Sequence, residues 1–377
     1  MIDYSKIPSP CYVLEEERLI RNLQLLQKVK KEAGVSIILA FKGFAMWSVF
    51  PTVRNYLDGA TASSLNEARL CNEEMRSKAH TYAVAYSDNE FDEIVSLSSH
   101  LTFNSLNQFN RFKDRVPGEV SMGLRVNPEW SDVKTDLYNP SSPVSRLGVT
   151  SEHLQHGVPE GIEGLHFHVL CESSSEALVT VLENLERKFE HILSKIKWVN
   201  MGGGHLITRE GYDKDLLIRT LKRFKEKYQV KVILEPGSAV AWQTGDLKST
   251  VLDIVENNGV KTAVMDISFT CHMPDCLEMP YKPKITSASE YTNKNYPFEY
   301  RIGGTSCLAG DFMEKYGFKN ELEIGDTLIF EDMIHYTMVK TTTFNGVKHP
   351  SIGIWKSIGD FELIREFGYG DYRDRLS

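Results

Sequence analysis

The sequence predicts an α/β fold, a (β/α)8 TIM barrel followed by a mostly antiparallel β domain. Eight short apolar runs alternate with amphipathic, charged stretches between residues 36 and 238. Alternation of strand and helix implies parallel strands joined by right-handed crossovers. After about residue 240, β-like runs follow one another with few long helices between them. A length of 377 residues suits two such domains.

The eight expected barrel strands are apolar runs that end in turn or polar residues. They are SIILAFKG (36–43), GATASS (59–64), TYAVAYS (81–87), HLTFNS (100–105), SMGLRVNP (121–128), GIEGLHFHVL (161–170), IKWVNMGGG (196–204) and KVILEPGS (231–238). Helix-like segments between them include NEARLCNEEM (66–75) and YDKDLLIRTLKRFKEKY (212–228). An open doubly wound sheet is the alternative, but no GxGxxG turn follows the first strand.

The second domain is predicted from runs separated by turn residues. These runs are STVLDIVENN, KTAVMDIS, PFEYRIGG, DTLIFEDM and HYTMVKTTT. Near the start, PCYVL predicts a strand and EEERLIRNLQLLQKVKKEA a helix. We expect this first strand to join the second domain. The expected barrel therefore spans residues 20–240, and the β domain combines 1–19 with 241–377.

Composition narrows the class of protein. A net charge of −8 argues against nucleic acid as the main partner, because phosphate contacts need a basic face. No apolar run approaches the roughly 20 residues that span a bilayer. The start lacks a secretory pattern, so we expect a cytoplasmic location and cysteines that are thiols. Cys271 and Cys276 lack zinc-ligand spacing and a second pair, so no metal site is expected.

Catalytic residues of a barrel lie at the carboxyl ends of its strands. Lys42 ends the first expected strand, and an amine emerging from apolar surroundings has a lowered pKa and greater nucleophilicity. A lysine that reaches solvent at a strand end is the alternative. Glu235 closes the eighth strand, where a carboxylate can keep the ring nitrogen of a cofactor protonated or cap the next turn.

Two further strand ends carry residues suited to a cofactor. Gly202, Gly203 and Gly204 offer backbone amides that can wrap a phosphate, or they form a tight turn. His168 can lie flat on a cofactor ring or pack as an ordinary buried histidine. The residues alone leave both alternatives open.

The second domain also contains candidate residues. The Gly-rich loop GGTSCLAGD (303–311) carries Cys307 and Asp311. A thiol there can act as a general acid, worth about 10² to 10⁴ in rate, or be a buried cysteine in a turn. Tyr336 offers a hydroxyl near the last runs, with a packed sheet tyrosine as the alternative.

The order of these motifs resembles the fold-type III, alanine-racemase-like decarboxylases that depend on pyridoxal 5'-phosphate (PLP). Lys42 is followed by FHV with His168, GGG at 202–204, EPG at 235–237, GTSCLAGD, and YT…TFNG. The family includes ornithine, diaminopimelate and carboxynorspermidine decarboxylases, and the resemblance spans nearly the whole chain.

The resemblance implies a role for each residue. Lys42 is implied to hold PLP as a Schiff base, His168 to stack on its ring and Glu235 to bind its ring nitrogen. Cys307 is implied to be catalytic and, with Asp311, to come from the partner subunit of a head-to-tail homodimer. The residues implied to hold the cofactor phosphate are Gly202, Gly203, Gly204, Gly237 and Tyr336.

Departures from the wider family indicate one branch. Ser238 stands where diaminopimelate decarboxylases usually carry Arg, and a serine cannot replace a bidentate arginine. Leu308 stands where they usually carry an acidic residue. The FHVLCES stretch, the insert CHMPDCLEMPYKP (271–283) and the tail FGYGDYRD look most like carboxynorspermidine/carboxyspermidine decarboxylases.

This branch implies PLP-dependent decarboxylation of carboxynorspermidine or carboxyspermidine to norspermidine or spermidine, in polyamine biosynthesis. The two substrates differ by one methylene, worth only about 1 to 3 kcal/mol in a pocket. A long cationic substrate needs acidic partners for its distal amines. Asp311 is expected from the resemblance, and Asp275 and Glu278 from charge alone. The alternatives are decarboxylation of diaminopimelate or another basic amino acid, and racemisation.

Overall fold

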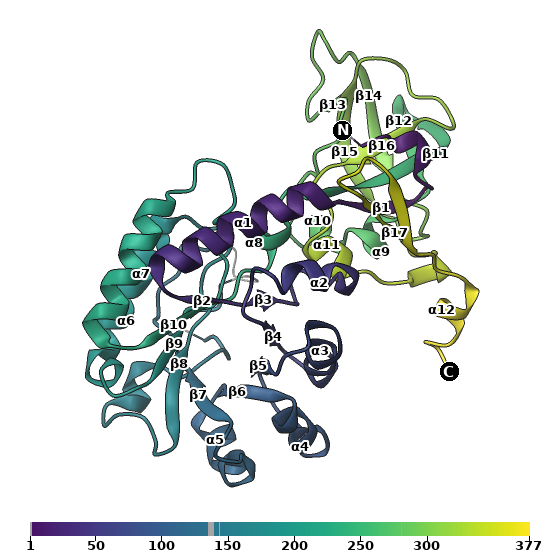
Figure 1. The fold of residues 1–377 in the computed structure, drawn as a ribbon. Coiled ribbons are helices and arrows are strands. Elements are labelled where there is room, and N and C mark those ends of the chain that lie inside the picture. Colours follow the sequence, from purple (N-terminus) through teal and green to yellow (C-terminus); the bar gives the residue numbers. More distant parts are fainter. Residues whose placement is uncertain (1, 135–138, 143, 280) are drawn as a thin grey trace. The chain divides into compact units, whose positions relative to one another are not determined.

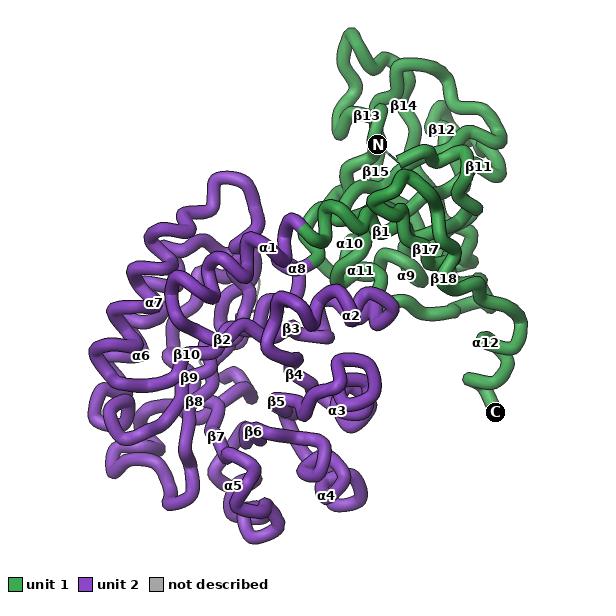
Figure 2. The backbone as a smooth tube through the Cα atoms, in the orientation of Figure 1, with its two compact units in different colours: residues 1–20, 241–377 green, residues 21–240 purple. Residues whose placement is uncertain are grey.

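The structure is a computed structural model that describes residues 2–134, 139–142, 144–279 and 281–377. The chain divides into two compact units (Figure 2). One, the barrel unit, consists of residues 21–240. The other, the β unit, combines residues 1–20 with 241–377. The boundaries expected from sequence lay at residues 19/20 and 240/241.

The barrel unit is a ring of parallel strands with helices outside it (Figure 1). β2 (Ser36–Ile37) and β3 (Leu39–Ala40) are two halves of one strand, since β2 pairs with β10 and β3 with β4. The remaining strands are β4 (Ala60–Ala62), β5 (Ala79–Tyr82), β6 (Ser98–Phe103), β7 (Ser121–Arg125), β8 (Ile162–His166), β9 (Trp198–Asn200) and β10 (Lys231–Leu234). Each lies within or overlaps one of the eight expected runs. The predicted barrel is therefore confirmed.

The helices of this unit begin where their capping residues predict. Ser64, Ser105, Ser174 and Asp213 each accept a hydrogen bond from the amide three residues on. The helices are α1 (Glu16–Ala33), which starts in the β unit, α2 (Phe50–Val53), α3 (Leu65–Leu70), α4 (Asp88–Ser96), α5 (Leu106–Phe112), α6 (Ser175–Leu193), α7 (Lys214–Tyr228) and α8 (Ser238–Ala241). The helix expected at 66–75 changes to a π-helical turn at Cys71–Met75.

Close packing of strands explains two glycines of the barrel. Trp198 on β9 is buried, and its indole lies against Gly123 on β7 and Gly164 on β8. A Cβ at Gly164 would lie 2.0 Å from an indole atom, and one at Gly123 would lie 2.3 Å away. Neither position has room for a side chain beside the indole.

The β unit is built on one mixed sheet, ordered β13-β15-β14-β12-β11-β1-β17-β18, with β16 also paired to β11. The strands are β1 (Cys11–Glu15), β11 (Gly245–Asn257), β12 (Val260–Met265), β13 (Ala288–Ser289), β14 (Phe298–Gly303), β15 (Phe312–Phe318), β16 (Thr327–Phe330), β17 (Ser351–Trp355) and β18 (Phe361–Arg365). β1 pairs antiparallel with β11 and parallel with β17. The expectation that the amino-terminal strand joins this sheet is confirmed.

Short helices connect these strands: α9 (Phe269–His272), α10 (Pro274–Glu278), α11 (Tyr336–Val339) and α12 (Tyr369–Arg373). The interpretation of HYTMVKTTT as a β run is wrong, because this segment contains α11. Its β-branched composition favours a strand, but a tertiary contact opposes that preference. The Thr337 hydroxyl donates to Asp275 Oδ2 at 2.9 Å, and the Thr342 amide donates to the Cys271 carbonyl at 2.8 Å.

Candidate active site

Lys42 follows β3 at the carboxyl end of the barrel. The residues before it, Ile37 to Phe41, are buried, so the strand is anchored on apolar contacts. The lysine side chain keeps solvent-exposed surface, while its amine lies 3.0 Å from His168 Nε2. An amine that is reachable yet surrounded by protein suits a nucleophile.

The hydrogen bonds of His168 define the protonation state of this pair. The Gly203 amide donates to His168 Nδ1 at 3.0 Å, so Nδ1 is an acceptor and a neutral ring carries its proton on Nε2. That Nε2–H then donates to Lys42 Nζ, which accepts only as a neutral amine. The observed network therefore belongs to the deprotonated form of Lys42, as an assignment from geometry.

The surroundings of Lys42 shift its protonation equilibrium toward that neutral form. Burial, followed by the charge of Arg125, lowers the pKa of Lys42 from 10.5 to about 8, and Glu235 opposes the shift. At pH 7 this leaves about a tenth of the amine neutral, roughly 300-fold more than for an ordinary lysine. Burial and then the charge of Lys42 hold the pKa of His168 well below its usual range.

Glu235 follows β10 as a carboxylate held in its charged form. Its Oε1 accepts a hydrogen bond from the Asn200 side-chain amide at 2.6 Å, and its Oε2 lies 3.6 Å from His166 Nε2. Burial acts to raise the pKa of Glu235, but His166 and Asn200 outweigh it, and the pKa falls to about 2. The separation of 3.6 Å is longer than a hydrogen bond. We therefore take Asn200 as the donor to Glu235 and His166 as a neighbouring dipole or charge.

The glycine run lies where three strand ends meet. A Cβ on Gly203 would lie 2.2 Å from the Glu235 carbonyl oxygen, and one on Gly204 would lie 1.8 Å from the Leu170 carbonyl oxygen. The amide of Gly202 donates to Asn200 Oδ1 at 2.9 Å, as that of Gly203 does to His168. These glycines thus bring the strand ends that carry His168 and Glu235 together.

Gly237 extends this close approach to the first strand. A Cβ at Gly237 would lie 3.0 Å from the Cα of Gly43, the residue after Lys42. The strand end of Glu235 and the turn of Lys42 therefore pack backbone against backbone. Substituting this glycine would force the two apart.

Three residues near Lys42 and Glu235 were not predicted from the sequence: Arg125, Asn200 and Glu67. Arg125 is buried at the end of β7, donates to the His168 carbonyl at 3.0 Å and stacks 4.6 Å from the Tyr82 ring centroid. Glu67 accepts from the Ser63 amide at 2.6 Å, and its charge acts on Lys42. An arginine within an expected buried strand was the available signal, because arginine is almost never fully buried unless paired.

The β unit holds the other predicted residues. Cys307 is exposed, in the loop between β14 and β15. Asp311 is only 5% exposed, and its two carboxylate oxygens accept from the Thr270 and Ser306 amides at 3.0 Å each. The carboxylate of Asp311 is therefore bound within its own unit.

Tyr336, Asp275 and Glu278 also lie in the β unit. Tyr336 begins α11 and is half-buried. Asp275 is buried, and its Oδ2 accepts from the hydroxyls of Tyr281 and Thr337 at 2.8 and 2.9 Å. Glu278 pairs with Lys340. The acidic candidates therefore each have protein partners.

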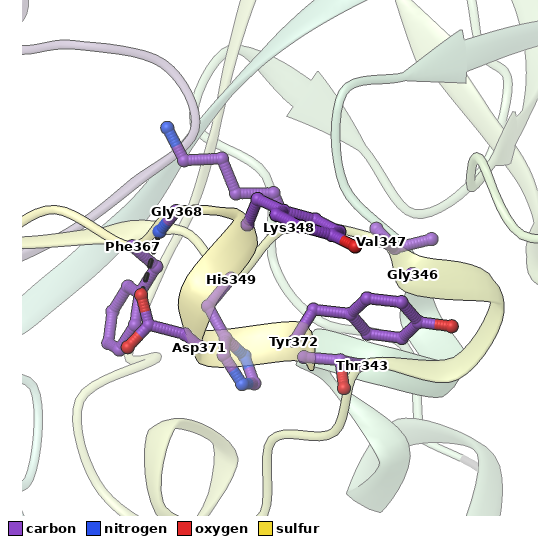
Figure 3. A pocket seen from close by; sticks show the side chains of 10 residues that line it. Thr343, Gly346, Val347, Lys348, His349, Phe367, Gly368, Asp371 and Tyr372 are labelled. Atoms are coloured by element: carbon purple, nitrogen blue, oxygen red, sulfur yellow. Dashed lines mark hydrogen bonds between the residues drawn. The ribbon is translucent and has the colours of Figure 1, made fainter. Parts of the chain in front are cut away.

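A cavity of about 260 Å³ in the β unit lies apart from the predicted residues (Figure 3). It lies between the turn around Gly346 and helix α12, and its walls include Thr343, His349, Phe367 and Tyr372. None of the predicted site residues lines it. Because its chemistry is mixed, it indicates no ligand class.

Two features are absent from the described residues. They contain no group of three or more His, Cys, Asp or Glu side chains arranged to hold a metal ion. In the same parts of the chain, no helix combines the length and apolar character needed to cross a membrane.

Comparison with known proteins extends these observations. A profile described as "Pyridoxal-dependent decarboxylase, C-terminal sheet domain" matches residues 11–334. The chain is 50% identical to the carboxyaminopropylagmatine decarboxylase of Synechocystis, over 99% of this chain and 96% of that one. It is 44% identical to a carboxynorspermidine/carboxyspermidine decarboxylase of Campylobacter jejuni, over 98% of each.

A solved structure is similar over the same length. Carboxynorspermidine decarboxylase from Campylobacter jejuni, complexed with norspermidine, superposes with a TM-score of 0.91 at 43% identity. The match covers 98% of this chain and 100% of that one. The resemblance inferred from the motif order is confirmed.

Proposed function

Because the chain belongs to the pyridoxal-dependent decarboxylase family, we propose that it releases CO2 from a carboxylated polyamine. One observation carries the proposal. The Lys42 amine has the hydrogen-bond geometry of its neutral form, and it lies at the same end of the barrel as the ionised Glu235. The substrate class rests on relatives of 50% and 44% identity that are named for such substrates.

The cofactor of this enzyme is PLP, and the barrel end has side chains that fit it. PLP, when bound, supplies the electron sink for the electron pair left by the departing CO2. Lys42 would provide the amine that binds its aldehyde, and ionised Glu235 would keep a proton on its ring nitrogen. His168, whose orientation is held by the Gly203 amide, would lie against the ring.

We assign the phosphate to backbone amides and a hydroxyl. Gly202 and Gly203 already donate to Asn200 and His168, so their main part is to let the strand ends approach. Gly204 and Gly237 would then present backbone amides to the phosphate, and the hydroxyl of Tyr336 is a further contact that the family resemblance implies.

Cys307 would donate a proton to the carbon that has lost CO2. Its exposure in the β unit suits a residue that completes the site of a second chain in a homodimer. Mixing Lys42→Ala with Cys307→Ala protein tests this arrangement, since hybrid dimers regain one complete site. Activity is expected to return to a fraction of wild type; hybrid dimers with no activity would refute shared sites.

The candidate carboxylated polyamines differ in the group at their far end. Carboxynorspermidine and carboxyspermidine end in a primary amine, whereas the substrate named for the 50% identical relative ends in a guanidinium. A guanidinium offers planar, bidentate hydrogen bonding that an ammonium lacks. Acceptors placed to bind the guanidinium therefore bind the ammonium less well. The higher identity is the specific reason to test this second candidate.

The test is CO2 release from a panel. It includes both carboxylated spermidine-type substrates, carboxyaminopropylagmatine, diaminopimelate, ornithine, lysine and arginine, with Lys42→Ala as the inactive control. Release from a carboxylated polyamine at least tenfold faster than from any amino acid is expected. Preference for diaminopimelate or ornithine would overturn the substrate class, and α-proton exchange without CO2 would indicate a racemase.

The proposed setting is polyamine biosynthesis in the cytoplasm. Six free cysteines, including exposed Cys307, suit a reducing compartment. Fractionation followed by detection of the protein tests this location, and recovery outside the cytoplasm would contradict it.

A further inference from the structure

We propose that Asp311 and Asn345 form a two-sided clamp that positions Cys307, an inference that rests on the proposed role of this thiol as proton donor. Two successive backbone amides of the loop donate hydrogen bonds to different side chains. The Ser306 amide donates to Asp311 Oδ2 at 3.0 Å, and the Cys307 amide donates to Asn345 Oδ1 at 2.8 Å. The backbone is therefore held on both sides at the residue that carries the thiol.

The Asp311 side of the clamp is buried and preformed. Its other oxygen, Oδ1, accepts from the Thr270 amide at 3.0 Å, which ties the loop to α9. The Gly304 amide donates to the Asp311 carbonyl at 2.8 Å. A Cβ at Gly304 would lie 2.4 Å from Asp311 Oδ2, so the glycine lets the loop close over the carboxylate. A carboxylate that accepts amide hydrogen bonds on both oxygens is a strong anchor.

The Asn345 side uses an unusual backbone conformation. Asn345 lies in the turn Phe344–Gly346 with φ +57°, a left-handed conformation that asparagine, aspartate and glycine adopt most readily. The turn is held from two directions. Cys271 Sγ lies 3.5 Å from the Phe344 carbonyl oxygen, and Tyr372 of α12 packs on Gly346, where a Cβ would lie 3.5 Å from its ring (Figure 3).

The clamp changes the interpretation of Asp311. Its carboxylate has amide partners on both oxygens and is 5% exposed, whereas a distal amine of the substrate needs a reachable acceptor. Asp311 is thus a positioning residue, which acts through the backbone of residues 306 and 307. Cys307 itself remains exposed, because the clamp holds its backbone and leaves its side chain free to point outward.

The left-handed conformation of Asn345 permits a clean substitution test. Asn345→Gly removes the acceptor without backbone strain, and Asn345→Asp keeps an acceptor in the same conformation. Asn258 also has a positive φ, of +49°, in a turn between β11 and β12, so Asn258→Gly controls for the added flexibility of glycine. Hydrogen exchange of the Cys307 amide, resolved by fragmentation mass spectrometry, reports the bond directly in the intact PLP-bound enzyme.

In Asn345→Gly, the Cys307 amide is expected to exchange roughly fivefold faster than in wild type, the effect of losing one net hydrogen bond. Asn345→Asp restores slow exchange, and Asn258→Gly leaves it unchanged. For CO2 release, kcat of Asn345→Gly falls by roughly tenfold or more while KM stays within about twofold, because the thiol acts after binding.

Equal exchange in Asn345→Gly and wild type would overturn the clamp, as would equal exchange in Asn345→Gly and Asn345→Asp. Faster exchange with unchanged kcat would show that the clamp does not serve catalysis. Failure of the proposed function is distinguishable, since wild-type protein would then release no CO2 from any carboxylated polyamine whatever the exchange rates.

Discussion

The lowered pKa of Lys42 makes a direct prediction about its reactivity. Relative to an ordinary lysine at 10.5, a pKa of about 8 corresponds to roughly 3 kcal/mol of preference for the neutral amine. In protein stripped of PLP, Lys42 should therefore acylate with a midpoint near pH 8. Competitive labelling with trace acetic anhydride between pH 6 and 11, read by mass spectrometry at each lysine, measures that midpoint.

A substitution tests the cause of the shift. Arg125→Met removes the positive charge that, after burial, contributes most to lowering the pKa of Lys42, so the midpoint should move upward. Arg111→Met is the matched control, since Arg111 is exposed on α5 and pairs with Asp88. A wild-type midpoint near 10.5 would refute the reasoning. A midpoint unmoved by Arg125→Met would show that burial, and not the charge of Arg125, lowers the pKa of Lys42.

Three further changes have expected outcomes. Glu235 has a folded-state pKa of about 2 against 4.5 ordinarily, so its ionised form stabilises the fold above pH 4.5, and this stability is lost as pH falls toward 2. Glu235→Gln should remove about 3 kcal/mol of that pH dependence in urea unfolding, and an unchanged acid limb would contradict the shift. Gly204→Ala should destabilise by about 2 kcal/mol or more and weaken PLP binding, because its Cβ meets a carbonyl at 1.8 Å; Gly118→Ala, in open space, is the control. Asp275→Ala should cost about 1 to 3 kcal/mol of stability by leaving two hydroxyls without their acceptor, with KM unchanged. A raised KM at unchanged stability would instead support substrate binding by Asp275.

Hydrophobic periodicity was enough to predict the barrel. Each strand is a short apolar run closed by a polar or turn residue, and that pattern depends on local sequence. The strand ends then fixed the positions of Lys42, His168 and Glu235, because parallel strands present their carboxyl ends on one side. What periodicity did not predict is the split of the first strand between Ile37 and Leu39.

Partners of charged residues were not predictable in the same way. Asp311 bonds an amide 41 positions away at Thr270, and Glu278 pairs with Lys340, 62 positions away. The resemblance suggested Asp311, and charge alone suggested Glu278, as partners of a cationic substrate, but only folding decides which donors surround a carboxylate. The helix at Tyr336–Val339 was missed for a related reason, since distant contacts overrode local β propensity.

The most direct measurement of the central claim is the site of PLP attachment. Borohydride reduction of the purified enzyme, followed by proteolysis and mass spectrometry, locates the lysine that carries the phosphopyridoxyl group. The account predicts that this group is on Lys42 and that Lys42→Ala protein carries none. Attachment to another lysine, or reducible PLP absorbance retained in Lys42→Ala, would contradict it.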